Sequence, residues 1–193
     1  MLIKYIKRRI RSVGMLWGKN SSAWLGHVIK RGTERQPVLN DLVLHHELVP
    51  IKIEGVKDTV YISTADFALL NEPHQYDNIA KIIAPLDNML WDRSLVEQIF
   101  NFKYTWEVYL PASKRKYGYY VLPVLYKNQF VARFEPQKLS TDSELVIRQW
   151  WWEPGLKVTP EIKEAVFKGM NYFCKYVGTN KLSESSVKII SEV

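Results

Sequence analysis

Cysteine is nearly absent from this 193-residue chain, in which Cys174 is the single thiol. One thiol forms no internal disulfide and supplies no cysteine-based zinc site, so the composition favours a reducing, cytoplasmic compartment. Long apolar runs are also missing, and none approaches the roughly 20 residues that a membrane-spanning helix needs. Basic residues continue through Arg11, where a secretory leader has an unbroken apolar core. We therefore expect neither a membrane segment nor a leader.

The common motifs of cofactor and nucleophile chemistry are missing as well. The sequence contains no glycine-rich phosphate loop and no Gly-x-Ser-x-Gly elbow. His45 and His46 are adjacent, whereas two metal ligands on one helix face stand three or four residues apart, and His27 and His74 are isolated. We therefore expect no metal site and no cofactor, and we interpret Cys174 as a packing residue.

Acidic residues are scarce in one region only. Residues 1–35 carry nine basic side chains and one acidic side chain, a net charge of +8, whereas the rest of the chain sums to −1. Concentrated positive charge attracts nucleic acid or an anionic membrane surface, although a solvated helix face has the same composition. The candidate DNA-binding residues in this region are Arg8, Arg9, Arg11, Lys30, Arg31 and Arg35.

The periodicity of residues 1–75 is helical and then alternating. Three helices are predicted, over residues 2–12, 16–29 and 33–46. The third begins with a capping box, in which Thr33 and Gln36 satisfy each other's backbone amides. Apolar residues then alternate over 49–62, which predicts a two-stranded hairpin. Three helices followed by a hairpin are typical of a winged helix, which we expect over residues 1–75.

The remainder of the chain is largely β in character. Apolar patterns predict strands over residues 105–110, 119–126, 130–134 and 145–151. Asp92 is a plausible N-cap for a short helix through Phe100, and a last helix begins at Thr159-Pro160 and stops at Gly178. We therefore expect an α+β chain: the winged-helix unit, then a small antiparallel β-barrel-like domain with a closing C-terminal helix over 76–178, then a polar, frayed tail over 179–193.

A basic and aromatic run between two predicted strands is the second DNA-binding candidate. Lys114, Arg115, Lys116 and Tyr117 are expected at the tip of a hairpin. Such cations contact phosphates, and the ring can stack on or wedge against a base. An ordinary solvated turn with its tyrosines against the sheet is the alternative.

Two carboxylates are the catalytic candidates. Asp87 and Asp92 stand close enough in the sequence to suggest a pair for acid–base chemistry. The alternative, which we favour, is structural: Asp87-Asn88 forms a turn, and Asp92 caps a helix.

Several long strings in the chain resemble one family. They are Ala-Pro-Leu-Asp-Asn-Met-Leu-Trp-Asp-Arg at 84–93, Phe-Asn-Phe-Lys-Tyr at 100–104, and the run from Tyr109 to Pro123. Together with Arg9–Gly14 and Trp152–Gly155, they resemble the winged-helix DNA glycosylase family of the AlkZ and YcaQ type. The resemblance implies tandem winged helices followed by a β-barrel domain, and excision of alkylated or crosslinked bases without a metal.

The resemblance covers only the C-terminal half of those longer bacterial proteins. Their catalytic motif, Gln-x-Gln or Gln-x-Asp, belongs to the N-terminal winged helices. The resemblance therefore implies that the catalytic centre is missing here. We assign to that motif none of the glutamines at positions 36, 75, 98, 129, 137 and 149.

Three interpretations of the chain stay open. It is a truncated C-terminal portion of a glycosylase, a natural short relative that binds DNA without cutting it, or the partner of a separately encoded N-terminal half. In each case we expect double-stranded DNA as the partner and no glycosylase activity from this chain alone. A stand-alone winged-helix DNA-binding or protein-interaction module is the alternative function, and attachment of residues 2–13 to a membrane surface is a third.

Overall fold

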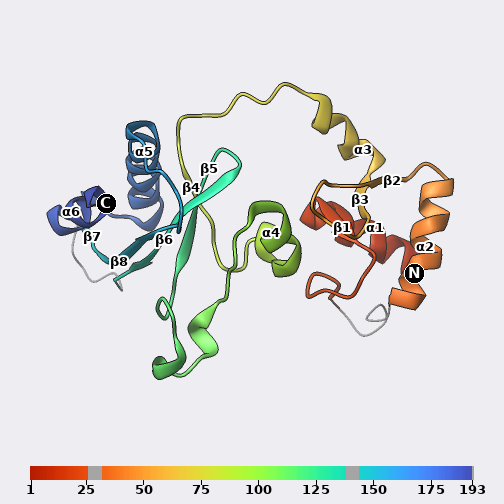
Figure 1. Ribbon diagram of the computed structural model, residues 1–193, viewed down its shortest axis with the longest axis horizontal. Coiled ribbons are helices and arrows are strands. Elements are labelled where there is room, and N and C mark those ends of the chain that lie inside the picture. The colour runs from red at the N-terminus through yellow and green to blue at the C-terminus, as the bar shows by residue number, and fades with distance from the viewer. Residues whose placement is uncertain (26–31, 138–143, 193) are drawn as a thin grey trace. The chain divides into compact units, whose positions relative to one another are not determined.

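The computed structural model describes residues 1–25, 32–137 and 144–192. The chain is a mixed α+β protein that divides into two compact units (Figure 1). The first unit comprises Met1–His74 and Leu86–Tyr104. The second comprises Gln75–Pro85 and the chain from Thr105 onward. No helix within the described ranges is long and apolar enough to cross a membrane.

The first unit combines helices with a three-stranded antiparallel sheet of order β1-β3-β2. Along the chain, the elements up to the last strand of this sheet are α1 (Leu2–Val13), β1 (Met15–Trp17), α2 (Gly32–Leu44), β2 (Leu48–Ile51) and β3 (Val60–Ser63). The elements that follow are α3 (Thr64–Phe67), η2 (Ala68–Asn71), η3 (Asn88–Leu90) and α4 (Arg93–Phe100). The hairpin predicted over residues 49–62 is confirmed as β2 and β3.

Helix α1 confirms its predicted amphipathic pattern. Ile6 and Ile10 are fully buried against α2 and the sheet, while the opposite face carries most of its charge. The helix ends at Gly14, whose positive φ of 92° lets its N–H donate to the Ile10 carbonyl at 2.9 Å. A residue with a side chain is strained in that conformation, which explains the glycine.

The second predicted helix is wrong over the part of it that the structure describes. Met15–Trp17 forms β1, which pairs antiparallel with β3, and a turn follows instead of a helix. Residues 26–29 of that prediction lie outside the described residues. Leu16 and Trp17 are both fully buried. A short apolar run of this kind has the same composition in a helix and in a strand, and only the distant partner β3 decides between them.

Helix α2 begins one residue earlier than predicted, and the capping box is not formed. The side-chain amide of Gln36 donates to Asn40 Oδ1 and to the Tyr61 hydroxyl, each at 2.9 Å. Gln36 therefore joins α2 to β3 instead of capping the helix. Leu39 and Leu42 are buried on the inner face of α2, as the pattern predicted.

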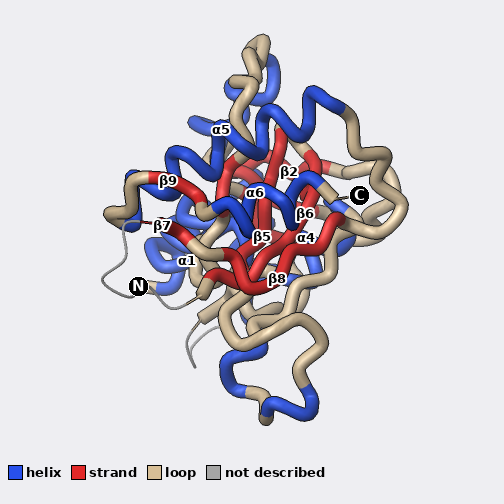
Figure 2. The backbone as a smooth tube through the Cα atoms, turned by 90° about the vertical axis from the view of Figure 1, so that its left-hand side faces the viewer, coloured by secondary structure: helices blue, strands red, loops and turns tan. Residues whose placement is uncertain are grey.

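The second unit contains a four-stranded antiparallel sheet of order β4-β5-β6-β8. Its strands are β4 (Lys81–Ile82), β5 (Leu122–Tyr126), β6 (Gln129–Pro136) and β8 (Ile147–Trp152), and a parallel pair is formed by β7 (Glu144–Leu145) and β9 (Lys181–Leu182). Its helical elements are η4 (Glu107–Tyr109), η5 (Ala112–Lys114), α5 (Pro160–Val177) and α6 (Glu184–Ser191). Helices α5 and α6 overlie this sheet in the view of Figure 2. They share one buried cluster of side chains with it.

Two features of the predicted barrel-like domain are corrected. Within the described part of the chain no pairing joins β4 to β8, so the sheet has two edges and is open, not a closed barrel. Residues 105–110 are not a strand, because η4 occupies 107–109 and the Glu107 side chain binds backbone amides of a later loop. The strands predicted over 119–126, 130–134 and 145–151 are confirmed as β5, β6 and the β7–β8 segment, with shifted ends.

The predicted polar tail is wrong, because residues 181–191 form β9 and α6. Ser183 caps α6 by accepting from the Ser186 N–H at 3.2 Å. The fully buried Ser186 hydroxyl accepts from the Ile147 N–H at 2.7 Å and donates to the Leu145 carbonyl. The polar composition of this segment misled the prediction, since two of its serines, Ser183 and Ser186, are buried and make internal hydrogen bonds.

Helix α5 confirms both of its predicted ends. Thr159 Oγ1 accepts from the Ile162 N–H at 3.3 Å, and Gly178 terminates the helix in the left-handed conformation. The middle of α5 lies very close to the segment before β4, where the Ala80 N–H donates to the Ala165 carbonyl at 2.9 Å. A Cβ atom at Gly169 would lie 2.2 Å from the Ala80 carbonyl oxygen. Glycine is therefore required at this contact.

We expect Gly169→Ala to lower the free energy of unfolding by about 2 kcal/mol, because backbone must move to admit the methyl group. Alanine ordinarily stabilises a helix interior relative to glycine by about 1 kcal/mol, so the sign of the change is diagnostic. Urea unfolding of both proteins measures it. The matched control is Asn171→Ala on the exposed side of α5, for which a change within about 0.5 kcal/mol is expected. A stabilised Gly169→Ala protein would contradict the close approach.

Candidate nucleic-acid interface

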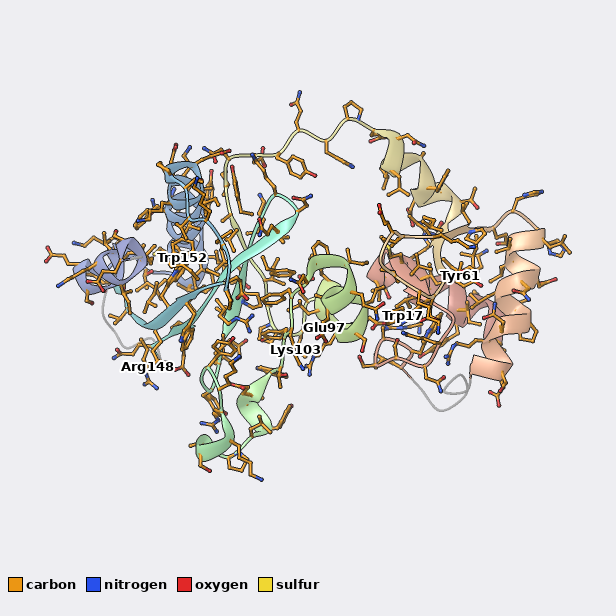
Figure 3. All side chains as sticks on the ribbon, in the orientation of Figure 1. Trp17, Tyr61, Glu97, Lys103, Arg148 and Trp152 are labelled. Atoms are coloured by element: carbon orange, nitrogen blue, oxygen red, sulfur yellow. The ribbon has the colours of Figure 1, made fainter. Side chains whose placement is uncertain are left out.

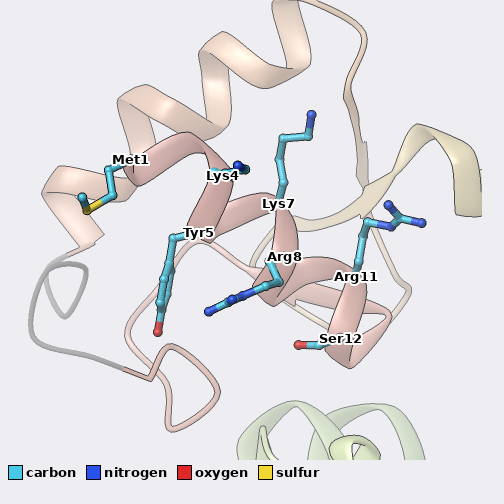
Figure 4. Close-up of a pocket in the computed structure, with 7 residues that line it drawn as sticks. All are labelled: Met1, Lys4, Tyr5, Lys7, Arg8, Arg11 and Ser12. Atoms are coloured by element: carbon cyan, nitrogen blue, oxygen red, sulfur yellow. The ribbon is translucent and has the colours of Figure 1, made fainter.

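One face of α1 carries a row of cations. Lys4, Lys7, Arg8 and Arg11 line an open groove along this helix together with Met1, Tyr5 and Ser12 (Figure 4). Lys4, Arg8 and Arg11 are exposed, and in the described part of the chain no ion pair joins any of them to a carboxylate. Lys7 is paired with Glu47. This row of side chains is called the α1 basic face below.

The dimensions of the α1 basic face suit a phosphate backbone. Lys4 and Arg11 are separated by seven residues, or about 10 Å along the axis at 1.5 Å per residue. One strand of duplex DNA carries a phosphate about every 3.4 Å along its axis, so about three phosphates lie over that distance. Three unpaired cations thus match the local charge of one strand.

Arg9, by contrast, is a buried residue. Its guanidinium donates from Nε and Nη2 to the Ala23 carbonyl at 3.0 and 2.6 Å and lies 4.4 Å from the centre of the Trp91 ring. Burial lowers the pKa of Arg9 from its ordinary value. The helical wheel contained this information, because Arg9 stands three residues after Ile6 and four before Val13, on the apolar side of α1.

Arg35 is also buried, with no exposed surface. Its guanidinium donates to the Gly18 carbonyl at 3.0 Å and to Asn20 Oδ1 at 2.8 Å, and it lies 5.0 Å from the Trp24 ring centre. Burial lowers its pKa as well. Arg9 and Arg35 therefore hold loops in place, and neither contributes to an exposed basic surface. Lys30 and Arg31 lie outside the described residues.

The basic run of the second unit lies in a loop that leads from η5 to β5. Lys114 and Lys116 are exposed, while Arg115 donates to the Leu110 carbonyl at 2.9 Å and lies 4.8 Å from the Tyr119 ring centre. The exposed rings near these cations are Tyr109, Tyr119 and Tyr120, at 82, 51 and 40% exposure. Cations and accessible rings thus occur together here, as contacts to phosphates and bases require.

The hairpin tip expected at residues 114–117 is wrong, because η4 and η5 precede this run in place of a strand, and Tyr117 is half-buried. The Arg133 guanidinium lies 4.2 Å from its ring centre, and Trp151 packs edge-on against it at 5.2 Å between centroids. Arg133 is itself paired with Glu153 at 2.7 Å. Tyr117 therefore fixes the loop to the sheet and leaves the outward positions to Tyr119 and Tyr120.

Two buried carboxylates hold this loop, and the sequence analysis identified neither. Glu107 accepts from the backbone amides of Lys116, Tyr117 and Gly118 at 2.9, 2.8 and 3.1 Å. Glu135 accepts from the next two amides, those of Tyr119 and Tyr120. No pattern in the sequence predicts this arrangement, because the two partners of each bond come together only in the folded chain.

The loop can approach Glu135 this closely because residue 118 is a glycine. A Cβ atom at Gly118 would lie 2.6 Å from the Glu135 carboxyl carbon. Burial raises the pKa of Glu107, but the three amide donors and the charge of Arg133 together lower it by more than burial raises it. The resulting pKa lies below its ordinary value. The folded loop therefore favours an ionised Glu107.

The two candidate catalytic carboxylates have the structural roles that the sequence analysis favoured. Asp87 caps η3 by accepting from the Met89 N–H at 2.9 Å. Asp92 caps α4 by accepting from the Leu95 N–H at 3.1 Å. Each carboxylate accepts one backbone N–H at the start of its own helix.

One further pair has the spacing of the motif that the sequence analysis considered missing. Gln75 and Asp77 have the spacing Gln-x-Asp. The expectation that no glutamine of the chain belongs to such a motif is therefore wrong for Gln75, as far as the spacing is concerned. Both side chains are exposed in a segment without regular structure, and Asp77 forms an ion pair with Lys81 at 3.7 Å.

Within the residues that the structure describes, no group of three or more His, Cys, Asp or Glu side chains is suited to a metal ion. Cys174 is buried in the core, as predicted.

Comparison with models of known protein families gives a match. A protein-family model described as DNA glycosylase AlkZ-like matches residues 2–168, which covers both basic surfaces and the first half of α5. No solved structure matches the chain.

We expect Glu107→Gln to lower the free energy of unfolding by about 2 kcal/mol at pH 7, because hydrogen bonds to a charged acceptor are lost in a buried place. The folded-state pKa of Glu107 is lowered, so its contribution is present above its unfolded pKa and is lost as the pH falls through the folded value. The difference between the two proteins should therefore shrink below about pH 4.

Urea titrations between pH 2.5 and pH 7 measure this difference. Glu164→Gln is the control, since Glu164 forms an exposed pair with Lys168 on α5 and its removal should change stability by less than about 0.5 kcal/mol. A constant difference between Glu107→Gln and the unsubstituted protein across this range would show that Glu107 does not act as an ionised acceptor.

Proposed function

The chain belongs to the AlkZ-like DNA glycosylase family, and on that basis we propose that it binds duplex DNA without sequence preference in the repair of damaged bases. The observation that carries this proposal is the α1 basic face, where three exposed cations stand along one side of a helix. Phosphate contacts of this kind supply affinity and position a protein on DNA, but they carry no sequence information.

The topology of the first unit supports a winged helix. Helices α1 and α2 precede the β2–β3 hairpin, and β1 completes a three-stranded sheet. In helix-turn-helix proteins a helix ahead of the recognition helix crosses the DNA backbone. An α1 that contacts phosphates has that role here, and the hairpin takes the place of the wing.

The loop between η5 and β5 supplies a second contact. Its cations suit phosphates, and its exposed rings, Tyr119 and Tyr120, suit the faces of bases that a lesion has partly unstacked. Glu107 and Glu135 already hold this loop in place. The loop therefore loses little conformational entropy when DNA binds.

We further propose that this chain alone does not excise bases. Base excision needs a carboxylate or amide positioned beside the target sugar in a site from which water is largely excluded. Asp87 and Asp92 cap helices, and Asp77 is exposed in an irregular segment. The arrangement of these carboxylates supports DNA binding as the contribution of this chain.

We expect the logarithm of the DNA-binding constant to fall with the logarithm of salt concentration with a slope of about −4 to −5, for about five phosphate contacts. Replacing Lys4, Arg8 and Arg11 together by alanine should make the slope shallower by about 2.7, since each lost contact removes about 0.9. Fluorescence anisotropy on a labelled duplex between 50 and 200 mM salt measures both values.

The charge-matched control replaces Lys157, Lys175 and Lys188, three exposed lysines of the second unit, by alanine. It removes the same net charge and should change the slope by less than about 1. Equal slopes for the two triple variants would reject the α1 basic face as the contact surface. Absence of duplex binding at low salt would favour an acidic protein partner, and binding to anionic vesicles would favour a membrane surface.

We expect no base release when the chain is incubated with an alkylated duplex and abasic sites are then cut with alkali. Strand cleavage should equal that of a sample without protein, because Asp87 and Asp92 cap helices and Asp77 is exposed in an irregular segment. Cleavage above that level, removed by Asp77→Asn, Asp87→Asn or Asp92→Asn, would identify the catalytic residue and overturn the proposal.

A further inference from the structure

Three aromatic side chains form a cluster at the surface of the second unit. The Trp106 ring is in edge-on contact with Tyr109 at 5.4 Å and with Tyr120 at 6.3 Å between ring centres, and each pair has an interplanar angle of 77°. Tyr109 is 82% exposed and Tyr120 is 40% exposed. Two tyrosine rings therefore contact one indole and still present much of their surface to solvent. These three residues are called the Trp106 cluster below.

Glu107 holds both segments that carry this cluster. Trp106 directly precedes Glu107, and Tyr109 ends η4 two residues after it. The Glu107 side chain accepts from the backbone amides of residues 116–118, and Tyr120 lies two residues farther along that loop. The exposed rings therefore stand on backbone segments that are already tied together, so a ligand that stacks on them has little chain to order.

The surroundings of the Trp106 cluster are basic. Lys114 and Lys116 are exposed, and Arg115 lies between them. The single acidic residue over 105–120 is Glu107, which is buried and bonded to backbone amides. A ligand that suits this surface combines negative charge with flat rings, which is the chemistry of a nucleic-acid strand.

The exposed rings favour an unpaired strand over an intact duplex. Bases inside a duplex are stacked on their neighbours, so their faces are closed to a protein ring. An unpaired strand opens the face of each base, and stacking on an aromatic side chain then raises affinity by about fivefold or more per base, whatever the base. Tyr119 is less suited to this contact, because the Arg115 guanidinium already lies over its ring at 4.8 Å from the centre.

We propose that the Trp106 cluster binds the bases of an unpaired DNA strand. Tyr109 and Tyr120 stack on bases, and Lys114 and Lys116 contact the phosphates of the same strand. The substrate class is DNA in which an unpaired segment adjoins a duplex, as at a gap, a bulge or a strand end. The choice of DNA as the polymer rests on the proposed function, whereas the exposed rings and the cations beside them do not.

The experiment measures binding of the full chain to three labelled probes by fluorescence anisotropy. The probes are a blunt duplex, the same duplex with a single-stranded extension of four thymidines, and the same duplex with four tetrahydrofuran residues in place of the thymidines. The last two probes have the same phosphates, and only the thymidine probe has bases in its extension. We expect the thymidine probe to bind at least about fivefold more tightly than the base-free probe, because the base-free extension has nothing to stack.

Substitutions in the second unit assign this ratio of affinities to the rings. Replacing Tyr109 and Tyr120 together by alanine should bring the ratio to within about twofold of one, whereas Tyr109→Phe should keep it, because phenylalanine retains the stacking face. Lys114→Ala should weaken binding of both extended probes by a similar factor and leave the ratio as it is. The matched control replaces Tyr172 and Tyr176, which are 61 and 86% exposed on α5, and should also leave the ratio unchanged.

If the double variant fails to fold, Tyr109→Ala alone decides the question, because a side chain this exposed contributes little to packing. It should lower the ratio by at least about twofold. Equal affinity of the unsubstituted protein for the two extended probes, or a ratio that Tyr109→Ala leaves unchanged, would overturn the inference.

The blunt duplex separates this inference from the proposed function. Equal affinity for the two extended probes, with the expected salt slope on the blunt duplex, would reject the inference and leave the proposed function standing. A retained preference for the thymidine extension without measurable binding of the blunt duplex would reject duplex binding and support the Trp106 cluster. Absence of binding to all three probes at low salt would overturn both.

Discussion

The arrangement of the first unit depends on one buried cation, Arg9. Its guanidinium joins three segments that are distant in the sequence: α1, the turn that contains Ala23, and the segment that contains Trp91. Ser22 reinforces this junction by donating to the Trp91 carbonyl at 2.6 Å. Because Arg9 fixes the rotation of α1 about its own axis, Lys4, Arg8 and Arg11 are directed outward. A charge of the same sign thus serves inside the unit to position the charges outside it.

The second unit uses buried charge of the opposite sign for a related purpose. Glu107 and Glu135 together accept five backbone N–H groups of one loop, over residues 116–120. A loop held through its backbone keeps its side chains available, and this leaves Tyr119 and Tyr120 accessible. Arg133 and Trp151 complete the support by packing on Tyr117. Both units therefore show the same division, in which a buried ionic group bonds to the backbone inside and exposed side chains lie outside.

Local patterns predicted the parts of the fold that local interactions determine. The ends of α1 and α5, the cap at Asp92 and the β2–β3 hairpin follow from glycine, capping residues and periodicity within a few positions of each other. What the sequence could not show depends on distant partners. Strand β1 exists because β3 pairs with it, and α6 packs because Ser186 bonds to Leu145 and Ile147. Trp17 on β1 and Tyr61 on β3 are likewise buried in the first unit because these two distant strands pair (Figure 3). The candidate site was predicted in part: Arg8, Arg11 and the 114–116 run are exposed or half-exposed as expected, whereas Arg9 and Arg35 required knowledge of which carbonyls and rings surround them.

The return of Leu86–Tyr104 to the first unit has a consequence for the order in which the chain acquires its structure during synthesis. The chain passes between the two units three times, after residues 74, 85 and 104. The first unit lacks Trp91 and α4 until residue 104 has left the ribosome, although most of its core lies within the first 63 residues. Strand β4 is made before that point but finds β5 and α5 only 40 to 90 residues later. Each unit is therefore incomplete while part of the other is being made, and neither folds as a simple N-terminal or C-terminal block.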